Sequence, residues 1–390
     1  MARGIYIAGA GKDAGKTTLC LGLLKELNGR LPKGVSFIKP LGQKTTLVQG
    51  EQVGQDSWFV DKALGMGLSF EHSAPFAASS GAASRYIKLG EPTGIPEKIR
   101  RAYKYLSRKG QTVLVEGTGH PGVGSVFDLS NARVAQILET PVILVLDGGI
   151  GSTIDQFSLC SSMFYEHNVP LLGVVINRII PEKMEAVKLL LGKWFAEREI
   201  TVFGYIPYED SIAQPSLGLI HRAVGAEPIL AAKADADIAV AGHLTAFGST
   251  EEILQSVTKR PSRSLLVDKT RPNILDALVV HKLSGGKGPG AVIVCGGTPD
   301  SRRVEALKST GVPLYATKQG LEISAGKLSR KIFKVEPYEQ GKIDKIIEIV
   351  ATYVDVESIL SCLNKKGAGK IKTEKEGKVK RFFKKLFKRK

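Results

Sequence analysis

Cysteines and long apolar runs are scarce in this sequence. Its 390 residues include four cysteines, far apart, and no two of them form a CxxC pair. That spacing provides neither a disulfide framework nor a cysteine metal site, and it is typical of a protein in a reducing cytosol. No apolar run approaches the ~20 residues of a bilayer-crossing helix. The first residues lack a signal-peptide pattern, so we expect a cytoplasmic protein.

Positive charge is abundant but unevenly distributed. The formal net charge is +17, and residues 365–390 hold 13 Lys/Arg against two Glu, which accounts for +11 of it. The basicity therefore belongs mainly to a C-terminal tail, and the body of the chain is only mildly positive.

Residues 4–27, GIYIAGAGKDAGKTTLCLGLLKEL, contain the feature around which we organise the rest of the chain. Residues 5–8 form a short apolar run, glycines crowd positions 9, 11 and 15, and leucines then recur at helical spacing. This pattern predicts a strand, a glycine-rich turn and a helix. A helix N-terminus has free backbone N–H groups and a dipole that favours anions, so we predict a phosphate-binding loop.

The spacing of this loop is one residue longer than the pattern G-x4-G-K-[ST], whose first glycine would fall on Ala10. A longer pattern fits, from Gly9 to Gly15 and then Lys16-Thr17. We expect Lys16 to contact the outer phosphates and the Thr17 hydroxyl to reach magnesium. The predicted nucleotide-binding residues of the loop are Gly11, Lys12, Asp13, Ala14, Gly15, Lys16, Thr17 and Thr18.

Two charged residues end later strands. Lys39 follows a predicted strand at 35–38, and Glu116 closes an apolar strand at 111–116. Open α/β sheets bind ligands at the carboxyl edge, where a lysine can face a γ-phosphate and a carboxylate can hold magnesium. The alternatives are a solvated lysine and an exposed loop acid.

The order of the predicted elements indicates an α/β fold with a doubly wound parallel sheet. Continuous apolar strands such as 141–146 and 171–176 alternate with helices, which is typical of parallel strands covered on both faces. A second, smaller α/β unit follows it. We place the two domains at 1–208 and 209–358, and a basic tail at 359–390.

The first domain resembles dethiobiotin synthetase and related phosphate-loop (P-loop) ATPases. GAGKDAGKT matches the longer loop of that family. Lys39-Pro40, VLVEGTG around Glu116, GVVINR around Asn177 and GYIP ending at Pro207 follow in the family's order. These motifs cover about 200 residues.

This resemblance implies roles for individual residues. Asp56 would join Thr17 and Glu116 in holding magnesium, Asn177 would read adenine, and Pro207 would lie beside the base. It also implies a homodimer.

The second half resembles the DRTGG domain. LLVDKTRPNILDAL, GAVIVCGGTPD and GVPLYAT occur in that domain's order, and GKIDKIIEIVATYVD resembles its last helix. A P-loop ATPase followed by DRTGG is the arrangement in the N-terminal regulatory part of long bacterial phosphate acetyltransferases. We expect the acetyltransferase domain itself to be absent. The family's Asp-Arg is replaced by Thr270-Arg271 and its Thr-Gly-Gly by Cys295-Gly-Gly, so no ligand is predicted for this domain.

Two functions remain open, both with ATP and Mg²⁺ as cofactors. Lys16 and Lys39 could act as catalytic residues of an ATP-dependent ligase or phosphoryl-transfer enzyme whose co-substrate is a small carboxylate or amine. The alternative is a nucleotide-binding sensor that regulates a partner without substrate chemistry of its own. Acetyl transfer is not expected, and His120-Pro121 near the substrate site argues against dethiobiotin synthesis.

Two other classes fit the sequence poorly. A glutamine-dependent amide ligase of the cobyrinate type needs a Cys-His-Glu set, and no histidine follows Cys295. A partition-type ATPase would have a second lysine at the position of Gly11.

The basic tail has a second signal. Val379, Phe382, Phe383, Leu386 and Phe387 recur at helical spacing, and eight Lys/Arg lie between Lys378 and Lys390. This pattern predicts an amphipathic helix that can bind an anionic membrane, peripherally at its inner face. A disordered solubilising tail and nucleic-acid contact are the alternatives, and the apolar stripe favours lipid over nucleic acid.

Overall fold

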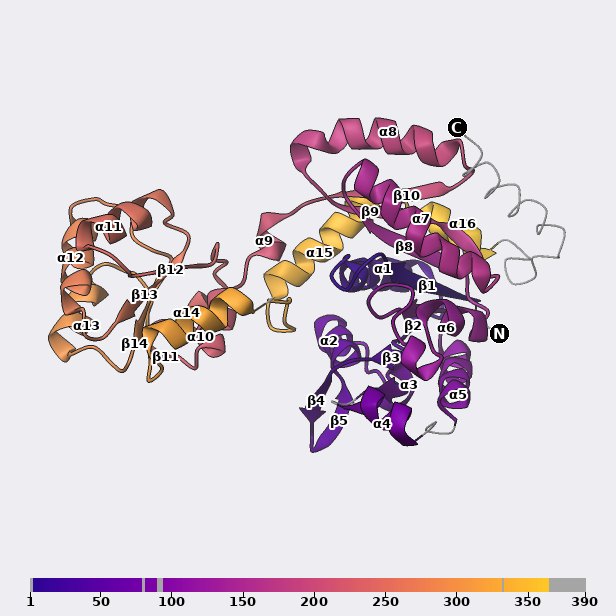
Figure 1. Cartoon of the computed structure of the whole chain (residues 1–390), viewed down its shortest axis with the longest axis horizontal. Coiled ribbons are helices and arrows are strands. Elements are labelled where there is room, and N and C mark those ends of the chain that lie inside the picture. The colour runs from indigo at the N-terminus through magenta and orange to yellow at the C-terminus, as the bar shows by residue number, and fades with distance from the viewer. Residues whose placement is uncertain (1–2, 79–80, 90–93, 332, 365–390) are drawn as a thin grey trace. The chain divides into compact units, whose positions relative to one another are not determined.

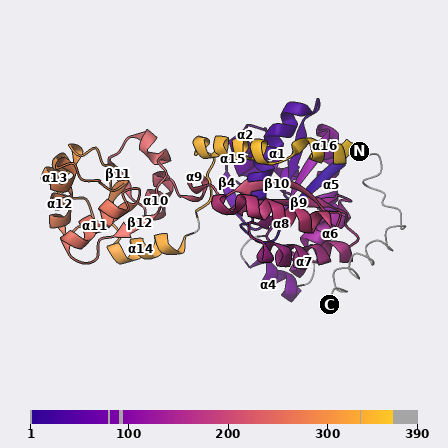
Figure 2. The same cartoon turned by 90° about the horizontal axis from the view of Figure 1, so that it is seen from above.

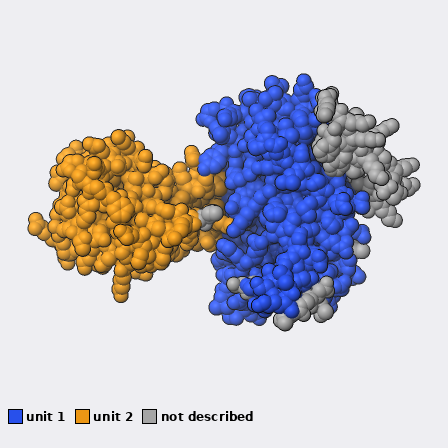
Figure 3. Space-filling view, in the orientation of Figure 1, with its two compact units in different colours: residues 1–208, 343–390 blue, residues 209–342 orange. Residues whose placement is uncertain are grey.

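A computed structural model describes residues 3–78, 81–89, 94–331 and 333–364, and the chain divides into two compact units. Unit 1 comprises residues 1–208 and 343–390, and unit 2 comprises residues 209–342 (Figure 3). Each unit contains its own sheet with helices packed against it (Figure 1). The predicted α/β class is therefore confirmed. None of the helices within the described ranges combines the length and the apolar character required to cross a bilayer.

The main sheet of unit 1 has six strands in the order β10-β9-β8-β1-β7-β2, and every neighbouring pair is parallel. The chain leaves β1 toward β2 and β7 on one side and later adds β8, β9 and β10 on the other, so β1 lies at the point where the strand order reverses. Ligands of such sheets bind at this point. The bounds are β1 Arg3–Gly9, β2 Val35–Ile38, β7 Thr112–Glu116, β8 Val142–Asp147, β9 Leu171–Ile179 and β10 Thr201–Pro207.

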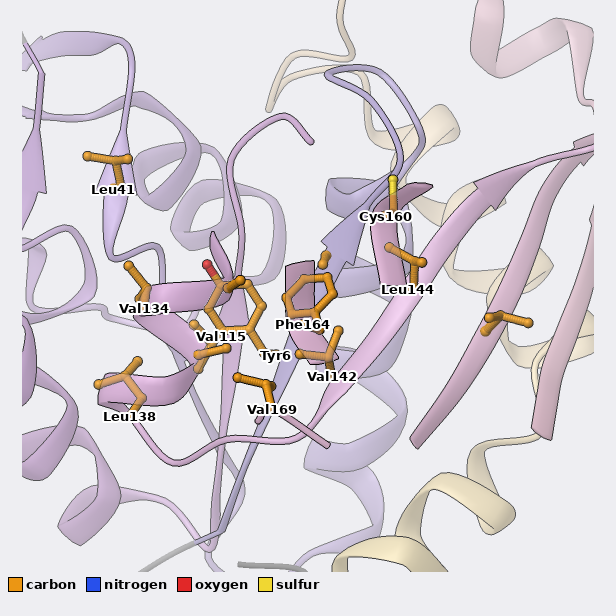
Figure 4. Close-up of a cluster of buried hydrophobic side chains, with 14 of the residues drawn as sticks. Tyr6, Leu41, Val115, Val134, Leu138, Val142, Leu144, Cys160, Phe164 and Val169 are labelled. Carbon is orange, nitrogen blue, oxygen red and sulfur yellow. The ribbon is translucent and has the colours of Figure 1, made fainter. Parts of the chain in front are cut away.

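Helices cover both faces of this sheet, which explains why its strands are apolar along their length. One face packs against buried side chains of α5 (Ile95–Lys109), α6 (Asn131–Ile137), α7 (Gly151–Glu166) and α8 (Met184–Ala196). Figure 4 shows part of this core, in which Tyr6 and Val115 from the sheet lie near Phe164 from α7. Helix α1 (Lys16–Arg30) contacts β1, β2 and β7.

The segment between β2 and α5 contains strands that the sequence did not predict. Strands β4 (Thr45–Val48) and β5 (Glu51–Gly54) form an antiparallel hairpin whose turn residues, Gln49 and Gly50, both have positive φ. Such a turn matches the twist of the flanking strands. The hairpin leads directly into α2, which carries Asp56 in its first turn. The remaining elements here are β3 (Leu41–Gly42), α2 (Gln55–Leu64), α3 (Phe70–Ser73), β6 (Phe76–Ala77) and α4 (Ala82–Leu89).

The predicted domain limits need correction at the C-terminal side. Most of α15 (Gln340–Tyr353) and all of α16 (Val356–Asn364) belong to unit 1, although we had assigned residues 343–358 to the second domain. The reason is packing: Val350 fills the space over Gly22 of α1, where an added Cβ would come within 2.2 Å of the Val350 Cβ. The Asp355 N–H also donates to the Phe203 carbonyl at 2.7 Å. Figures 1 and 2 show α15 beside α1.

The predicted start of the tail at residue 359 is also wrong. Residues 359–364 complete α16, in which Ile359 and Leu363 are buried. Arg30 of α1 forms an ion pair with Glu357. The amphipathic segment from Lys378 to Lys390 lies outside the described residues.

Unit 2 has a five-stranded sheet in the order β11-β15-β14-β13-β12, in which only β11 runs antiparallel to its neighbour. Its strands are β11 Glu227–Leu230, β12 His243–Thr245, β13 Ser264–Asp268, β14 Ala291–Cys295 and β15 Leu314–Thr317. Helices α11 (Thr250–Lys259), α12 (Pro272–Leu283) and α13 (Ser301–Lys308) pack on one face. Helices α10 (Leu217–Ala223) and α14 (Leu321–Arg330) pack on the other. The short α9 spans Asp210–Ala213.

Candidate nucleotide-binding site

The predicted phosphate loop connects β1 to α1. The Ala10 N–H donates to the Val145 carbonyl at 2.9 Å and so fixes the start of the loop to β8. Gly15 caps α1 in the left-handed conformation, with φ of 97°. An added Cβ at Gly15 would lie 2.0 Å from Asn177 Nδ2, so both the backbone conformation and the space require glycine. Lys12 and Asp13 are exposed at the tip of the loop.

Lys16 lies across this loop. Its side chain is 5% exposed, and Nζ donates to the Gly11 carbonyl at 2.6 Å and to the Lys12 carbonyl at 3.2 Å. The ammonium is thereby held against the backbone whose N–H groups we expect to contact phosphates. A positive charge at a helix N-terminus in this position adds to the attraction that the helix dipole exerts on an anion.

A buried cluster of charged side chains lies next to the first turn of α1. Glu116 is fully buried at the end of β7, and its Oε1 accepts hydrogen bonds from Thr17 Oγ1 at 2.8 Å and from Lys39 Nζ at 2.7 Å. The same Lys39 ammonium lies 2.8 Å from Asp56 Oδ2. Four residues from four elements therefore form one connected group: Thr17 from α1, Lys39 after β2, Asp56 from α2 and Glu116 from β7.

Lys39 is charged despite its burial. It is 7% exposed, and burial alone would lower the pKa of its ammonium. The carboxylates of Glu116 and Asp56 outweigh that effect and raise the pKa of Lys39 above its ordinary value. The cluster thus pairs one buried cation with two carboxylates.

The residues of this cluster fit a magnesium ion. Their donors are a hydroxyl and carboxylate oxygens, and Mg²⁺ prefers oxygen ligands. The 2.8 Å between Thr17 Oγ1 and Glu116 Oε1 is close to the ~2.9 Å edge of an octahedron with ligands at 2.0–2.1 Å. Glu116 Oε2 is buried and has no hydrogen-bond partner within the described part of the chain.

Protein side chains alone do not complete such a site. Among the described residues, no three His, Cys, Asp or Glu side chains gather as a metal-binding group. Magnesium in nucleotide sites is usually held by one or two carboxylates together with phosphate oxygens. Asp56 and Glu116 provide two carboxylates at this position.

The two residues expected near adenine lie on adjacent strands. Asn177 on β9 is 6% exposed, and its Nδ2 donates to the Ala14 carbonyl at 3.0 Å. Pro207 ends the neighbouring strand β10. The structure brings Asn177 to the back of the phosphate loop, and contact of either residue with adenine stays a prediction.

Sequence reasoning missed the residues that hold the loop after Glu116. Asn131, at the start of α6, accepts from the Thr118 N–H at 2.9 Å and donates to the Thr118 and His120 carbonyls at 2.7 Å each. Burial, together with the charge of Glu116, raises the pKa of Tyr6, whose hydroxyl donates to Asn131 Oδ1 at 2.8 Å. Only the helix-capping Ser130 beside Asn131 marked this position in the sequence.

The N-terminal part of the chain matches a known protein family. The family model AAA_26, described as an AAA domain, matches residues 3–216, which is more than half of the chain. The chain belongs to the AAA_26 family. Its AAA_26 region is a P-loop ATP-binding domain related to ATP-dependent synthetases.

Several curated proteins are similar to the chain. A phosphate acetyltransferase of Nitratidesulfovibrio vulgaris is 22% identical over 384 residues, which cover 95% of this chain and 53% of that protein. The chain thus spans about half the length of the phosphate acetyltransferases that it matches. An ATP-dependent dethiobiotin synthetase of Tolumonas auensis is 26% identical over 231 residues, which cover 56% of this chain and 96% of the synthetase.

A solved structure is also similar to part of the chain. It is the cobyrinic acid a,c-diamide synthase of Mycobacterium smegmatis, with bound ADP and magnesium. The match has 15% identity and a TM-score of 0.37, and it covers 54% of this chain and 88% of the synthase.

Proposed function

We propose that the loop from Gly9 to Thr18 binds the phosphates of ATP, with Mg²⁺ held by Thr17, Asp56 and Glu116. The observation that carries this proposal is the connected cluster at the base of the loop, in which Thr17 and Lys39 both donate to Glu116. Lys16 would contact the outer phosphates, and Asn177 and Pro207 would lie near adenine. Bound magnesium would neutralise charge that develops on the phosphate oxygens.

We propose that Lys39 faces the γ-phosphate and an incoming oxygen of a small co-substrate. In this reaction an oxygen of a carboxylate or carbamate attacks the γ-phosphorus, and ADP leaves with the bridging oxygen. Phosphoryl transfer depends mainly on positioning and charge neutralisation, which fixed lysines provide. The protein would then be an ATP-dependent ligase or phosphoryl-transfer enzyme.

The alternative is a nucleotide sensor. It is favoured by the similarity to phosphate acetyltransferases along nearly the whole chain, and by the resemblance of unit 2 to the DRTGG domain. In that case ATP binding would regulate a partner, and unit 2 would bind an effector. A screen of small carboxylates and amines for stimulated phosphate release, with consumption of the added compound measured beside it, separates the two functions, because a sensor does not consume its effector.

Calorimetry with ATP and Mg²⁺ on the full chain tests nucleotide binding itself. We expect one binding site in the unchanged protein and at least about a 100-fold loss of affinity in Lys16→Ala, since a charge-assisted phosphate contact disappears. Lys25→Ala removes an exposed lysine of the same helix and is expected to bind normally. Failure of the unchanged protein to bind ATP would overturn the proposal.

We further propose that the basic tail attaches the protein to anionic membranes. The sequence places three phenylalanines and eight Lys/Arg within residues 378–390, and each basic residue near such a surface contributes about 1 kcal/mol. The full chain should float with anionic vesicles, and a chain ending at Asn364 should not. Equal flotation of both would remove this proposal.

Sedimentation of the same two chains would test the proposed homodimer.

A further inference from the structure

The Lys39 ammonium occupies a specific position inside the proposed metal site. It lies 2.7 Å from Glu116 Oε1 and 2.8 Å from Asp56 Oδ2. Glu116 Oε1 also accepts from Thr17 Oγ1. Lys39 therefore links two of the three side chains proposed to hold magnesium, Asp56 and Glu116, and Thr17 bonds to Glu116 directly.

An ammonium and a divalent ion would compete for these oxygens. Magnesium would bind at 2.0–2.1 Å from its oxygens, and an ammonium bonded to the same atoms would be only about 3–4 Å from the ion. Repulsion between them would be strong, because the surroundings are poorly solvated: Glu116 is fully buried and Lys39 is 7% exposed. Glu116 Oε2 has no hydrogen-bond partner among the described residues, but a metal bound there would still lie within a few ångströms of the Lys39 charge.

We propose that Lys39 is a resident cation that excludes divalent metal from Thr17, Asp56 and Glu116 until nucleotide phosphates arrive. This inference rests on the proposed Mg-ATP function and adds an order to it, in which metal enters with the nucleotide. Lys39 acts here as a positioning residue.

Charge balance explains why a polyphosphate would release the lysine. The single positive charge of Lys39 offsets part of the charge on Asp56 and Glu116, so free metal ions gain little by entering. ATP brings oxygen acceptors to which a lysine on a flexible four-carbon stem can turn. The carboxylates are then free for the metal. Lys39 would thus pair with the carboxylates before the nucleotide binds and with the phosphates afterwards.

Binding of Mn²⁺ without nucleotide tests this inference, with free Mn²⁺ measured by electron paramagnetic resonance on the full chain. The unchanged protein should bind Mn²⁺ weakly, and Lys39→Met should bind it about 10- to 100-fold more tightly, because a unit charge within ~4 Å of the site is removed. Lys44→Met, which removes an exposed lysine five residues away, should behave as the unchanged protein does. The double change Lys39→Met/Asp56→Asn should lose the gain, which distinguishes binding at this cluster from adventitious binding.

A second measurement keeps the inference testable if Lys39→Met does not fold. Mn²⁺ uptake by the unchanged protein should rise at least tenfold when ATP is added, beyond the uptake by ATP alone. Equal Mn²⁺ affinity with and without ATP would overturn the inference, and so would a folded Lys39→Met protein with unchanged affinity. Failure of ATP to bind at all in calorimetry would instead overturn the proposed function, since the metal titration of the variants uses no nucleotide.

Discussion

The charged residues at the carboxyl edges of the two sheets differ in their burial and in their bonding partners. In unit 1, Glu116 and Lys39 at strand ends are buried and bonded to each other and to residues from α1 and α2. In unit 2, the carboxylate of Asp268 at the end of β13 accepts hydrogen bonds from the N–H and hydroxyl of Thr270, two residues ahead. Lys269 and Lys318 at the same edge are exposed.

The backbone at the edge of unit 2 is also committed to internal bonds. The N–H of Gly296 donates to the Gln319 carbonyl at 2.8 Å, and that of Gly297 donates to the Thr317 carbonyl at 2.9 Å. The two loops after β14 and β15 are thereby tied together, although both glycines have the positive φ common in anion-binding turns. These two N–H groups are therefore already bonded within unit 2. The long-range charge cluster distinguishes unit 1.

The largest difference between the units should appear when each is produced alone. Residues 209–342 form a sequence-continuous unit and should fold with a cooperative thermal transition. Residues 1–208 lack α15 and α16, whose Val350 and Ile359 are fully buried, so the fragment should lose at least about 5 kcal/mol. Thermal denaturation of the fragments beside the full chain measures this. A stable 1–208 fragment would contradict the assignment of these helices to unit 1.

The buried and exposed carboxylates give the next comparison. Glu116→Gln should cost about 3 kcal/mol of unfolding free energy, because the buried Lys39 ammonium would lose its buried carboxylate partner. Asp268→Asn should cost less than about 1 kcal/mol, since Asp268 bonds locally near solvent. Urea unfolding of both variants supplies the numbers. Equal costs would show that burial of Glu116 does not matter for stability.

Local sequence patterns predicted the structure correctly where a single segment forms it. Residues 4–27 were expected to form a strand, a turn and a helix, and they form β1, the loop and α1. The ends of β2 and β7 were placed correctly, because continuous apolar runs identify buried parallel strands. Lys39 was expected to face phosphate, but its bonds to two carboxylates were not foreseen. One of these bonds joins Lys39 to Glu116, which are 77 positions apart in the sequence.

The sequence also did not predict that α15 and α16 belong to unit 1, because this too depends on contacts between residues far apart in the chain. Residues 340–353 have an apolar stripe that indicates a helix, but nothing in that stripe says which core it covers. The partner is Gly22, a small residue within an otherwise ordinary leucine-rich helix. The feature that allows this packing is the lack of a side chain at Gly22, which lies more than 300 residues before Val350 in the sequence.

Glycine-to-alanine substitutions test the phosphate loop of unit 1 against the loop after β14 in unit 2. Gly15→Ala should cost about 2–3 kcal/mol and weaken ATP binding, because φ is 97° and the new Cβ would meet Asn177 Nδ2 at 2.0 Å. Gly297→Ala has a similarly unfavourable φ of 133°, but its nearest neighbour is the flexible Lys269 Nζ at 3.2 Å, so only about 1–2 kcal/mol is expected. Urea unfolding and ATP calorimetry of both variants measure these effects.

Adding Asn177→Ala to Gly15→Ala provides the control for the steric term. It should recover the part of the cost due to the clash and leave the part due to φ. If the double variant is no more stable than Gly15→Ala, the clash with Asn177 is not the cause of the loss.

The smallest expected effect is a mild acid sensitivity of unit 2. Burial, aided by Arg222, lowers the pKa of His221 although its ring contacts the Ala226 carbonyl, and burial, aided by Arg263, lowers the pKa of His243. Each histidine therefore takes up a proton more readily in the unfolded chain. Their stabilising contribution is present above an unfolded pKa near 6.5 and is lost as the pH falls below it.

Hydrogen exchange of peptides from β13 between pH 7.5 and 5.5 measures this loss, after correction for the intrinsic exchange rate. Glu336 acts in the opposite direction, because burial raises the pKa of its carboxyl and its protonation stabilises the folded state on acidification. The double change His221→Phe/His243→Phe isolates the histidines, and Phe at position 221 can keep the stacking on Tyr315, whose ring lies 4.7 Å away. The double variant should have a flatter pH profile than the unchanged chain. An equally steep profile would assign the acid sensitivity to other groups.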